Sequence, residues 1–219
     1  MDRLGLLEKR IPLCRKCPRL VRYLAEIKKQ FPTYWCRPVP GFGDPKAQIL
    51  LMGLAPGRFG SNRTGRMFTG DASGDFLYPV LHEVGLATRP KATAMNDRLK
   101  LKNAFITAVT RCAPPQNKPK PEEIKNCRPY LEEELKLLSD LKVVVALGKI
   151  AHDEYLRIRL KKEGGRLNDF PFRHGAVYQF KTEPKVLIDT YHPSRQNTNT
   201  GKLTREMFLK IFKLAANLM

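Results

Sequence analysis

The sequence of 219 residues has no run of about 18 apolar residues, the length with which a helix crosses a membrane. Its first segment, Met1–Cys14, mixes acids with bases and lacks the apolar stretch of a signal peptide. These two absences predict a cytoplasmic protein that is neither inserted in a membrane nor exported. Apolar residues still make up 42% of the chain, enough for a sizeable core, so we expect a single compact domain over residues 1–219.

Acidic residues are scarce, because only 21 Asp and Glu accompany 40 Lys and Arg, for a formal net charge of +19. A surplus of this size favours a polyanionic partner, since each phosphate that a cation neutralises releases condensed counterions. Nucleic acid is therefore the expected partner. A solubilising surface, the lysine enrichment of a thermophile and an anionic membrane surface are the alternatives.

The apolar runs of the chain lack the alternation of a half-exposed strand. Their continuous Val, Ile and Leu predict strands that are buried on both faces, over Gln48–Met52, Ala104–Val109, Val143–Leu147 and Val186–Thr190. Helical spacing lies between and after them, over Phe76–Val84, Pro121–Leu138, Lys149–Arg159 and Thr204–Leu218. This alternation predicts an α/β fold, a three-layer α/β/α sandwich around a four-stranded parallel sheet. We interpret Lys28–Gly43 as an irregular surface segment.

The segments that follow the four predicted strands carry the functional hypothesis. In open parallel sheets, ligands bind in the crevice beyond the carboxyl ends of the strands. Here those ends lead into GLAPG, RCAPPQNKP, LGK and YHPSRQNTNTG. All except LGK contain proline and have the composition of functional loops, so we expect these three to converge on one site.

The glycine-rich stretch Gly53–Gly74, GLAPGRFGSNRTGRMFTGDASG, lacks two phosphate-binding patterns. No G-K-[ST] follows at P-loop spacing and no G-x-G-x-x-G follows the strand, which argues against an enzyme of nucleotide metabolism. The stretch does offer backbone amides flanked by Arg58, Arg63 and Arg66, which can approach phosphate or a base. Phe68 among them is a candidate stacking platform for a nucleobase. A core residue that holds the loop down is the alternative.

Cysteine is also rare, with five residues in the chain. Cys14 and Cys17 form a C-x-x-C pair, and Cys112 and Cys127 follow much later. Four thiols suit zinc or an iron–sulfur cluster, and the spacing leaves both open. Disulfides are disfavoured in a reducing compartment, and a redox-active or incidental C-x-x-C pair is the alternative. Cys36 is the odd one out, although it could replace any one of the four ligands.

Taken as a set, the motifs are similar to those of a known family. GLAPG, NRTGRMFTGDASG, RCAPPQNKP and YHPSRQNTNTGKLT occur in this order, together with Cys14, Cys17, Cys112 and Cys127. In these segments the sequence resembles the fifth family (type b) of the uracil-DNA glycosylase superfamily. The resemblance implies a monofunctional DNA-repair enzyme that excises uracil and other deaminated bases from double- or single-stranded DNA. It also implies a structural 4Fe–4S cluster on these cysteines, and a monomer is the default for this architecture.

The resemblance implies catalytic roles for three residues. His192 stands where the family places a neutral histidine that donates a hydrogen bond to O2 of the leaving base; a structural role is the alternative. Related families carry an acid or amide beside the glycine of the first loop, where this sequence has Leu54. The resemblance points instead to Asn117 as a water ligand, and to Asp71 as a water ligand or partner of the cationic sugar. A turn role for Asn117 and a helix cap by Asp71, with Ser73 as a rival cap, are the alternatives.

A base that leaves the stack needs a pocket and nearby contacts to DNA. The expected pocket residues are Gly53, Ala55, Pro56, Gly57 and Phe68. Ala108 stands where several relatives place an asparagine that reads uracil, so we expect a broader scope that includes hypoxanthine. The side chains expected to contact DNA beside the pocket are Arg58, Arg63, Ser194, Arg195, Gln196 and Asn197.

The alternative function is that of a non-catalytic nucleic-acid-binding protein with a structural metal centre. Such a protein would share the charge, the cysteines and the fold, but it would need neither His192 nor Asp71.

Overall fold

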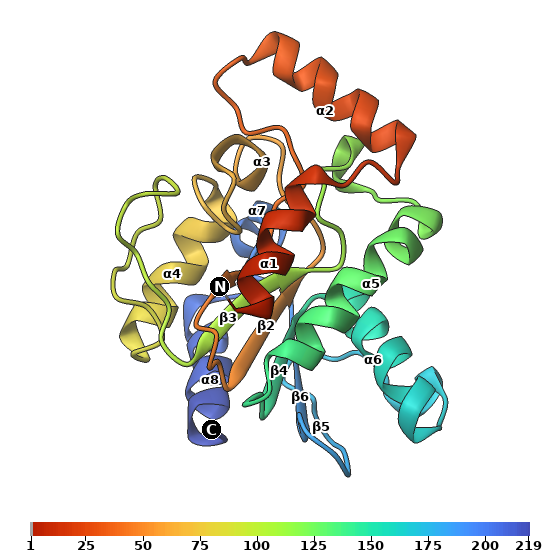
Figure 1. The fold of residues 1–219 in the computed structure, drawn as a ribbon. Coiled ribbons are helices and arrows are strands. Elements are labelled where there is room, and N and C mark those ends of the chain that lie inside the picture. Colours follow the sequence, from red (N-terminus) through yellow and green to blue (C-terminus); the bar gives the residue numbers. More distant parts are fainter. Residues whose placement is uncertain (1) are drawn as a thin grey trace.

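The protein, described by a computed structural model over residues 2–219, is built on one six-stranded sheet with the order β1-β3-β2-β4-β6-β5 (Figure 1). Its four central strands run parallel to one another: β2 (Ile49–Gly53), β3 (Ala104–Ala108), β4 (Val143–Leu147) and β6 (Val186–Thr190). All four were predicted from the sequence, with ends that differ by one residue at β2 and β3. The expectation of only four strands is wrong, because an antiparallel strand is added at each edge.

These edge strands are too short to produce a pattern in the sequence. β1 (Phe42–Gly43) has two residues and pairs with β3, and β5 (Val177–Gln179) has three residues and pairs with β6. A strand of that length cannot show either alternation or a continuous apolar run, so sequence patterning could not identify them.

The central strands are buried on both faces, as their composition predicts. In β2, Ile49 and Leu51 belong to the core on one face of the sheet, and Leu50 and Met52 belong to the core on the other. Successive side chains of a strand point to opposite faces, so a strand between two layers must be apolar throughout. The predicted three-layer α/β/α sandwich is confirmed.

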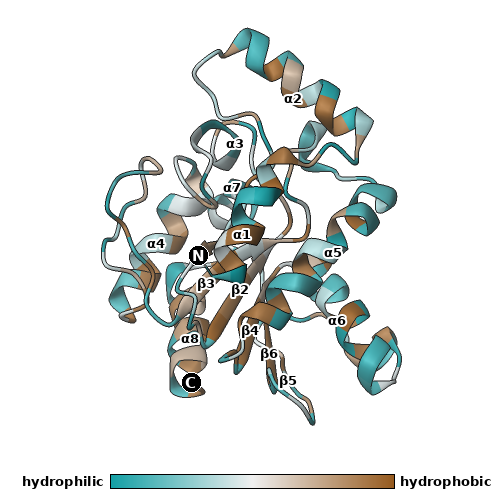
Figure 2. Ribbon diagram, in the orientation of Figure 1, coloured by the Kyte–Doolittle hydropathy of each residue, from teal (hydrophilic) through white to brown (hydrophobic). Residues whose placement is uncertain are grey.

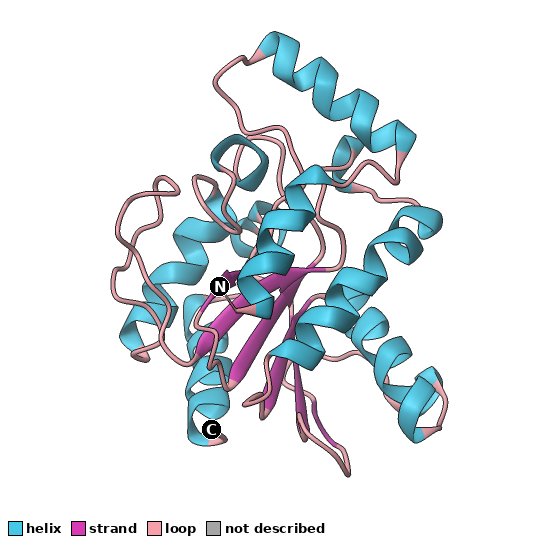
Figure 3. Ribbon diagram, in the orientation of Figure 1, coloured by secondary structure: helices cyan, strands magenta, loops and turns pink. Residues whose placement is uncertain are grey.

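The helical layers lie on either side of the sheet (Figure 3). On one face, α4 (Ala72–Glu83) packs against α8 (Arg205–Asn217), with Phe208 and Leu77 in the shared core. On the other face lie α5 (Pro121–Leu137) and α6 (Lys149–Glu163). The hydropathy colouring shows apolar strands in the centre and helices with mixed surfaces around them (Figure 2).

Two N-terminal helices were missing from the sequence analysis. α1 (Arg3–Arg10) packs beside α5, and α2 (Pro18–Gln30) stands at the top of the molecule in Figure 1. The interpretation of Lys28–Gly43 as irregular is wrong at both ends, since Lys28–Gln30 end α2 and Phe42–Gly43 form β1. α2 buries only Leu20, Leu24 and Ile27, a narrow stripe among many charges, which explains why its pattern escaped notice.

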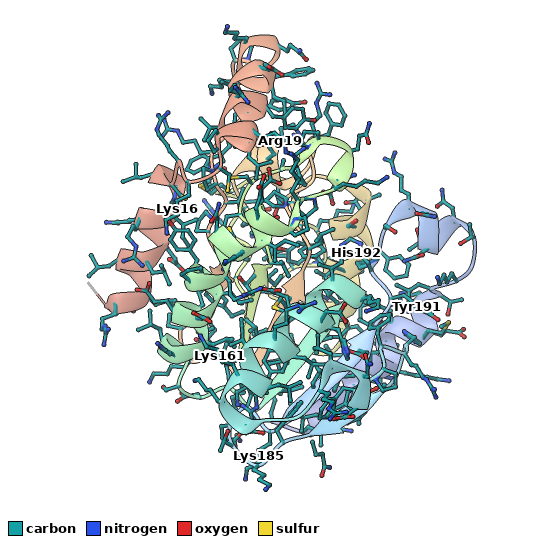
Figure 4. The ribbon with its side chains drawn as sticks, turned by 90° about the vertical axis from the view of Figure 1, so that its right-hand side faces the viewer. Lys16, Arg19, Lys161, Lys185, Tyr191 and His192 are labelled. Carbon is teal, nitrogen blue, oxygen red and sulfur yellow. The ribbon has the colours of Figure 1, made fainter. Side chains whose placement is uncertain are left out.

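α2 is joined to the main body by an ion pair. The Arg19 guanidinium donates to both carboxylate oxygens of Glu123, at 2.8 and 2.7 Å, and so ties α2 to the first turn of α5. Arg19 is labelled in Figure 4. The remaining short helices are η1 (Ile11–Leu13), α3 (Ser61–Thr64), η2 (Pro115–Asn117), η3 (Leu167–Asp169) and α7 (Arg195–Asn199). Among residues 2–219, none of the helices has the length and apolarity to cross a bilayer.

Candidate active site

Three of the four segments that follow the parallel strands meet around one cavity of about 1100 Å³. Phe68, Asn117 and His192, which lie far apart in the sequence, all line it. The LGK segment does not line the cavity. Its Gly148 N–H donates to the Thr190 carbonyl at 2.8 Å and so supports the chain that leads to His192. The predicted convergence of GLAPG, RCAPPQNKP and YHPSRQNTNTG is confirmed.

Phe68 forms part of the inner wall and has little exposed surface, at 8%. A Cβ atom at Gly53 would lie only 3.1 Å from Cζ of Phe68, so glycine at the end of β2 lets the ring approach the strand. The Phe68 backbone has φ 51° and its N–H donates to Ser61 Oγ at 2.9 Å. Phe68 therefore packs in the core, as the alternative interpretation expected, and also lines the cavity. Its role as a stacking platform for a nucleobase stays a prediction.

His192 lies on the chain between β6 and α7, beside Tyr191 (Figure 4). Its ring stacks on Phe68 with centroids 5.9 Å apart and an angle of 30°. Burial lowers the pKa of His192 to about 4. The imidazole is therefore neutral at pH 7 and carries one N–H, as a hydrogen-bond donor to an anionic leaving group requires.

Asp71 is the N-cap of α4, so the capping role proposed as an alternative is real. Its Oδ1 accepts a hydrogen bond from the Gly74 N–H at 3.0 Å, whereas Ser73 is not the cap. The other oxygen, Oδ2, points toward the turn before α3, where a Cβ atom at Gly60 would lie 1.8 Å from it. Burial raises the pKa of Asp71 above its ordinary value, and the Gly74 N–H opposes this shift. One oxygen is thus committed to the cap while Asp71 also lines the cavity.

Asn117 lies in η2, in a backbone turn that few residue types adopt. Gln116 and Asn117 have φ values of 56° and 57°, in the left-handed region that asparagine tolerates well. The Asn117 N–H donates to the Pro114 carbonyl at 3.2 Å. Asn117 therefore shapes a turn, as the alternative reading expected, and it also lines the cavity.

The arginines of the glycine-rich stretch have different environments. Arg63 donates to the carbonyls of Phe59 and Gly70, at 2.7 and 2.9 Å, and so holds two turns together. Arg66 is buried and forms a bidentate ion pair with Asp97, at 2.7 and 2.6 Å. Of the three arginines, Arg58 is the one that lines the cavity.

The segment after β6 brings further polar groups to the rim. Ser194, Arg195 and Gln196 line the cavity. Asn197 serves the loop itself, because its Nδ2 donates to the His192 carbonyl at 2.9 Å. Of the predicted pocket residues, Gly53, Ala55 and Gly57 line the cavity with Phe68, whereas Pro56 is buried behind them.

Several lining residues were not singled out in the sequence analysis, among them Tyr23, Phe59 and Gln116. Phe59 could have been found by the criterion that selected Phe68, an aromatic side chain within a basic, glycine-rich loop. Tyr23 had no such indication, since it comes from α2, outside the alternation of strands and helices.

A second, small cavity lies near the start of α2 and is lined by Cys14, Cys17, Cys112 and Cys127. Burial and the neighbouring thiols raise the pKa of Cys112, and burial raises the pKa of Cys127 to about 11. At neutral pH these thiols would be protonated unless a cation stabilised their thiolates. Cys36 lies elsewhere, with its Sγ 3.6 Å from Nδ2 of Asn62.

Four thiols around one cavity are the type of donor set that an iron–sulfur cluster uses. Over residues 2–219, no three histidine, cysteine or carboxylate groups come close enough to hold one ion. The Arg111 N–H donates to Cys127 Sγ at 3.3 Å, and Asn126 Nδ2 lies 3.7 Å from Cys17 Sγ. Arg111 also lines this cavity with two buried guanidinium nitrogens, Nε and Nη1, that lack partners.

Comparison with known proteins agrees with the geometry. The family model of the uracil DNA glycosylase superfamily matches residues 40–216. A type-5 uracil-DNA glycosylase of Thermus thermophilus is 52% identical over 223 residues, which cover 100% of this chain and 99% of that protein. A type-5 uracil-DNA glycosylase of Pyrobaculum aerophilum is 39% identical over 211 residues, covering 94% and 89%. A type-4 uracil-DNA glycosylase of Sulfurisphaera tokodaii is 32% identical over 220 residues, covering 98% and 86%.

The family inferred from the motifs is thereby confirmed. The match includes all six strands, and the loops that line the large cavity after β2, β3 and β6 lie within it. This chain belongs to the uracil-DNA glycosylase superfamily and, within it, to the type-5 family.

Proposed function

We propose that this protein hydrolyses the N-glycosidic bond of uracil in DNA and leaves an abasic site. The observation that carries the proposal is the meeting of Asp71, Asn117 and His192 around one cavity with an aromatic inner wall at Phe68. Such a cavity suits a nucleotide that is extruded from the duplex so that its C1′–N bond can be reached. We further propose that the 219 residues act as one domain and as a monomer, in the compartment that holds the genomic DNA.

We assign to His192 the stabilisation of the leaving base. As the bond breaks, negative charge accumulates on the pyrimidine, and a fixed N–H donor at O2 stabilises that charge more than it stabilises the substrate. The low pKa of His192 keeps the imidazole neutral over the physiological range. The stack on Phe68 and the hydrogen bond from Asn197 to the His192 carbonyl fix the ring and the backbone that carries it.

We assign to Asp71 and Asn117 the stabilisation of the cationic sugar and the binding of the water molecule that attacks it. The sugar gains positive character in the transition state, so a nearby carboxylate stabilises it. Leu54 lines the cavity at the position where related families carry an acid or amide, and its side chain cannot orient water. Asn117 and Asp71 both line the cavity, and their amide and carboxylate can form hydrogen bonds to a water molecule there.

The pocket has few groups that would select one deaminated base over another. Ala108 lines the cavity at the end of β3 and offers no side-chain hydrogen bond. We therefore propose that hypoxanthine is also a substrate, held mainly by stacking and by backbone contacts from the GLAPG segment. Excision of uracil with no measurable release of hypoxanthine from a matched duplex would contradict this extension.

We propose that Cys14, Cys17, Cys112 and Cys127 hold a 4Fe–4S cluster. When bound, the cluster would cross-link the start of α2, the end of β3 and α5 through its iron–sulfur bonds. Its role is structural, and the residues assigned to hydrolysis lie around the other cavity. Iron and sulfide analysis, with the visible absorbance of the purified protein, tests the assignment, and Cys17→Ser should lower all three.

The DNA is proposed to lie across the mouth of the large cavity, in double- or single-stranded form. Arg58, Ser194, Arg195 and Gln196 line that mouth and can contact phosphates or fill the space of the extruded base. Arg63 and Asn197 do not line the cavity and donate to backbone carbonyls, so we assign them a supporting role in the loops that carry the contacts.

The test of the proposed function is incubation of purified protein with a duplex that contains one deoxyuridine. A monofunctional glycosylase should release free uracil, and the strand should break only after alkaline treatment of the abasic site. The matched duplex with deoxythymidine is the control. Tight binding of the uracil duplex without release of uracil would instead identify a non-catalytic nucleic-acid-binding protein.

A further inference from the structure

Phe59 is an exposed aromatic side chain at the mouth of the large cavity. It lines the cavity and is 56% exposed, whereas Phe68 deeper inside is 8% exposed. The hydrolysis proposed above gives Phe59 no task. Keeping an aromatic ring in water is unfavourable, and exposed aromatic side chains beside a binding site are typical contact residues.

Neighbouring side chains hold the ring in place. The Arg58 guanidinium carbon lies 5.0 Å from the Phe59 ring centre, in a cation–π arrangement. Phe31, just after α2, meets Phe59 edge-on, with ring centres 6.2 Å apart and planes at 89°. Phe31 is in turn stacked on Tyr34, at 4.6 Å and 19°. Phe59 is therefore the outermost of a row of aromatic rings.

The backbone of Phe59 is fixed as well. Its carbonyl accepts from Nε of Arg63 at 2.7 Å, while Nη2 of the same guanidinium donates to the Gly70 carbonyl at 2.9 Å. The Gly60 N–H donates to the Gly57 carbonyl at 3.3 Å and closes the turn. A pre-positioned ring loses little conformational freedom when a partner binds, so it contributes more to affinity than a mobile one.

The cavity has room for more than one base. Its volume of about 1100 Å³ exceeds the range of roughly 300–1000 Å³ typical of pockets for small ligands. The inner part is defined by Phe68 and His192, which were assigned to the extruded base. Phe59, Tyr23 and Arg195 also line the cavity and have no role in holding that base.

We propose that Phe59 is a second nucleobase-stacking site, which takes the nucleotide next to the extruded one. Extrusion leaves that neighbour without its stacking partner. Aromatic side chains combined with cations are the usual platform for unstacked bases, and Arg58 beside Phe59 is placed to pair with the adjoining phosphate. This inference rests on the proposed function and assigns a further subsite to the same cavity.

The kinetic test compares Phe59→Ala, Phe59→Trp and the unchanged protein on a uracil-containing duplex. Stacking of Phe59 on the neighbouring base stabilises the bound substrate and the transition state equally. Loss of this stacking should therefore raise KM about tenfold and leave kcat unchanged. Phe59→Trp keeps the aromatic face and should retain the original KM. A fall in kcat at constant KM in Phe59→Ala, or no change in either constant, would overturn the proposal.

A binding test follows the neighbouring base directly. 2-Aminopurine placed beside the uracil fluoresces more strongly when it is unstacked, and we would measure it in an Asp71→Asn background. With Phe59 present the fluorescence should stay low on binding, and with Phe59→Ala it should rise. Equal fluorescence in the two proteins, for the label on either side of the uracil, would refute the stacking site.

Two controls test whether a change in KM is due to the Phe59 ring itself. Leu214→Ala removes another exposed apolar side chain, 37% exposed on α8, and should leave KM unchanged. The melting temperature of Phe59→Ala should match that of the unchanged protein, since the ring is largely in solvent. If the unchanged protein released no uracil, the proposed function would fail, and the fluorescence assay would still report on stacking.

Discussion

Asp71 caps a helix and also lines the large cavity, where we propose that its charge stabilises the sugar. Its Oδ1 caps α4, and the turn around Gly60 approaches Oδ2 so closely that no Cβ fits. Helix capping and charge stabilisation need different properties of the side chain, an acceptor oxygen in the first case and a negative charge in the second. A substitution that keeps the acceptor and removes the charge therefore separates them.

Asp71→Asn should keep the cap and lose activity. Asparagine caps helices about as well as aspartate, so the melting temperature should stay close to that of the unchanged protein. Loss of the carboxylate should lower kcat for uracil release by about 100-fold or more. Asp71→Ala should show the same loss of activity and about 1 kcal/mol less stability. Full activity in Asp71→Asn would leave the cap as the whole role of this residue.

The lowered pKa of His192 predicts how the stability of the fold changes at acid pH. Its pKa is about 4 in the folded protein, because it is buried, and about 6.5 in an unfolded chain. Between these values the unfolded state binds the proton more readily, so the contribution of His192 to stability falls as the pH falls from about 6.5 toward 4. Urea unfolding at about pH 7 and pH 5 should show a smaller loss of stability in His192→Gln, by up to about 2 kcal/mol. Parallel losses in the two proteins would contradict the low pKa.

At the scale of elements, the end of β3 and α5 are locked by one buried carboxylate. Glu134 on α5 accepts hydrogen bonds from Thr107 in β3 and from Arg111 just beyond it. Both members of the Arg111–Glu134 ion pair are almost without exposed surface. The pair fixes the segment that carries Cys112 and continues to Asn117, so it positions parts of both cavities.

Glu134→Ala should be strongly destabilising, because it leaves the Arg111 charge buried without its partner. We expect a loss of about 3–5 kcal/mol in the free energy of unfolding, measured by urea titration. Glu133 is the matched control, since its partner Arg10 lies on the surface. Glu133→Ala should cost at most about 1 kcal/mol. Similar losses in the two variants would mean that the buried pair is not the link between these elements.

The sequence predicts some of the helices and strands of this fold and not others. β2, β3, β4 and β6 were predicted because a strand buried on both faces is apolar throughout, and the meeting of their loops follows from the geometry of a parallel sheet. The short β1 and β5 and the narrow apolar stripe of α2 carry too little pattern. Tyr23 could not be placed at the cavity for the same reason. The sequence could not show that Asp71 both caps α4 and lines the cavity, or that Phe68 both packs in the core and lines it.

At the scale of the whole molecule, the net charge of +19 is spread widely. Arg58 and Arg195 line the large cavity, while Lys161 and Lys185 lie toward the opposite end of the molecule from Arg19 (Figure 4). A general positive field attracts DNA to every face, but only the cations that touch phosphates release counterions in the bound complex. Charge alone therefore does not define the contact surface.

The salt dependence of DNA binding should identify the cations that make contact. The logarithm of affinity should fall linearly with the logarithm of salt concentration, by a slope of about 0.9 for each neutralised phosphate. Arg58→Ala and Arg195→Ala should each reduce that slope by about 1. Lys161→Ala and Lys185→Ala are the controls and should leave it unchanged. Equal effects of all four substitutions would argue against a DNA path across the cavity mouth.

The position of α2 has a practical consequence for dissecting this protein. The family match begins at residue 40, and yet the segment before it contributes Cys14, Cys17 and Tyr23 to the two cavities. A recombinant fragment trimmed to the shared superfamily region would contain every strand. It would still lack two of the four thiols and the Tyr23 side chain, so we expect the leading segment to be required for activity.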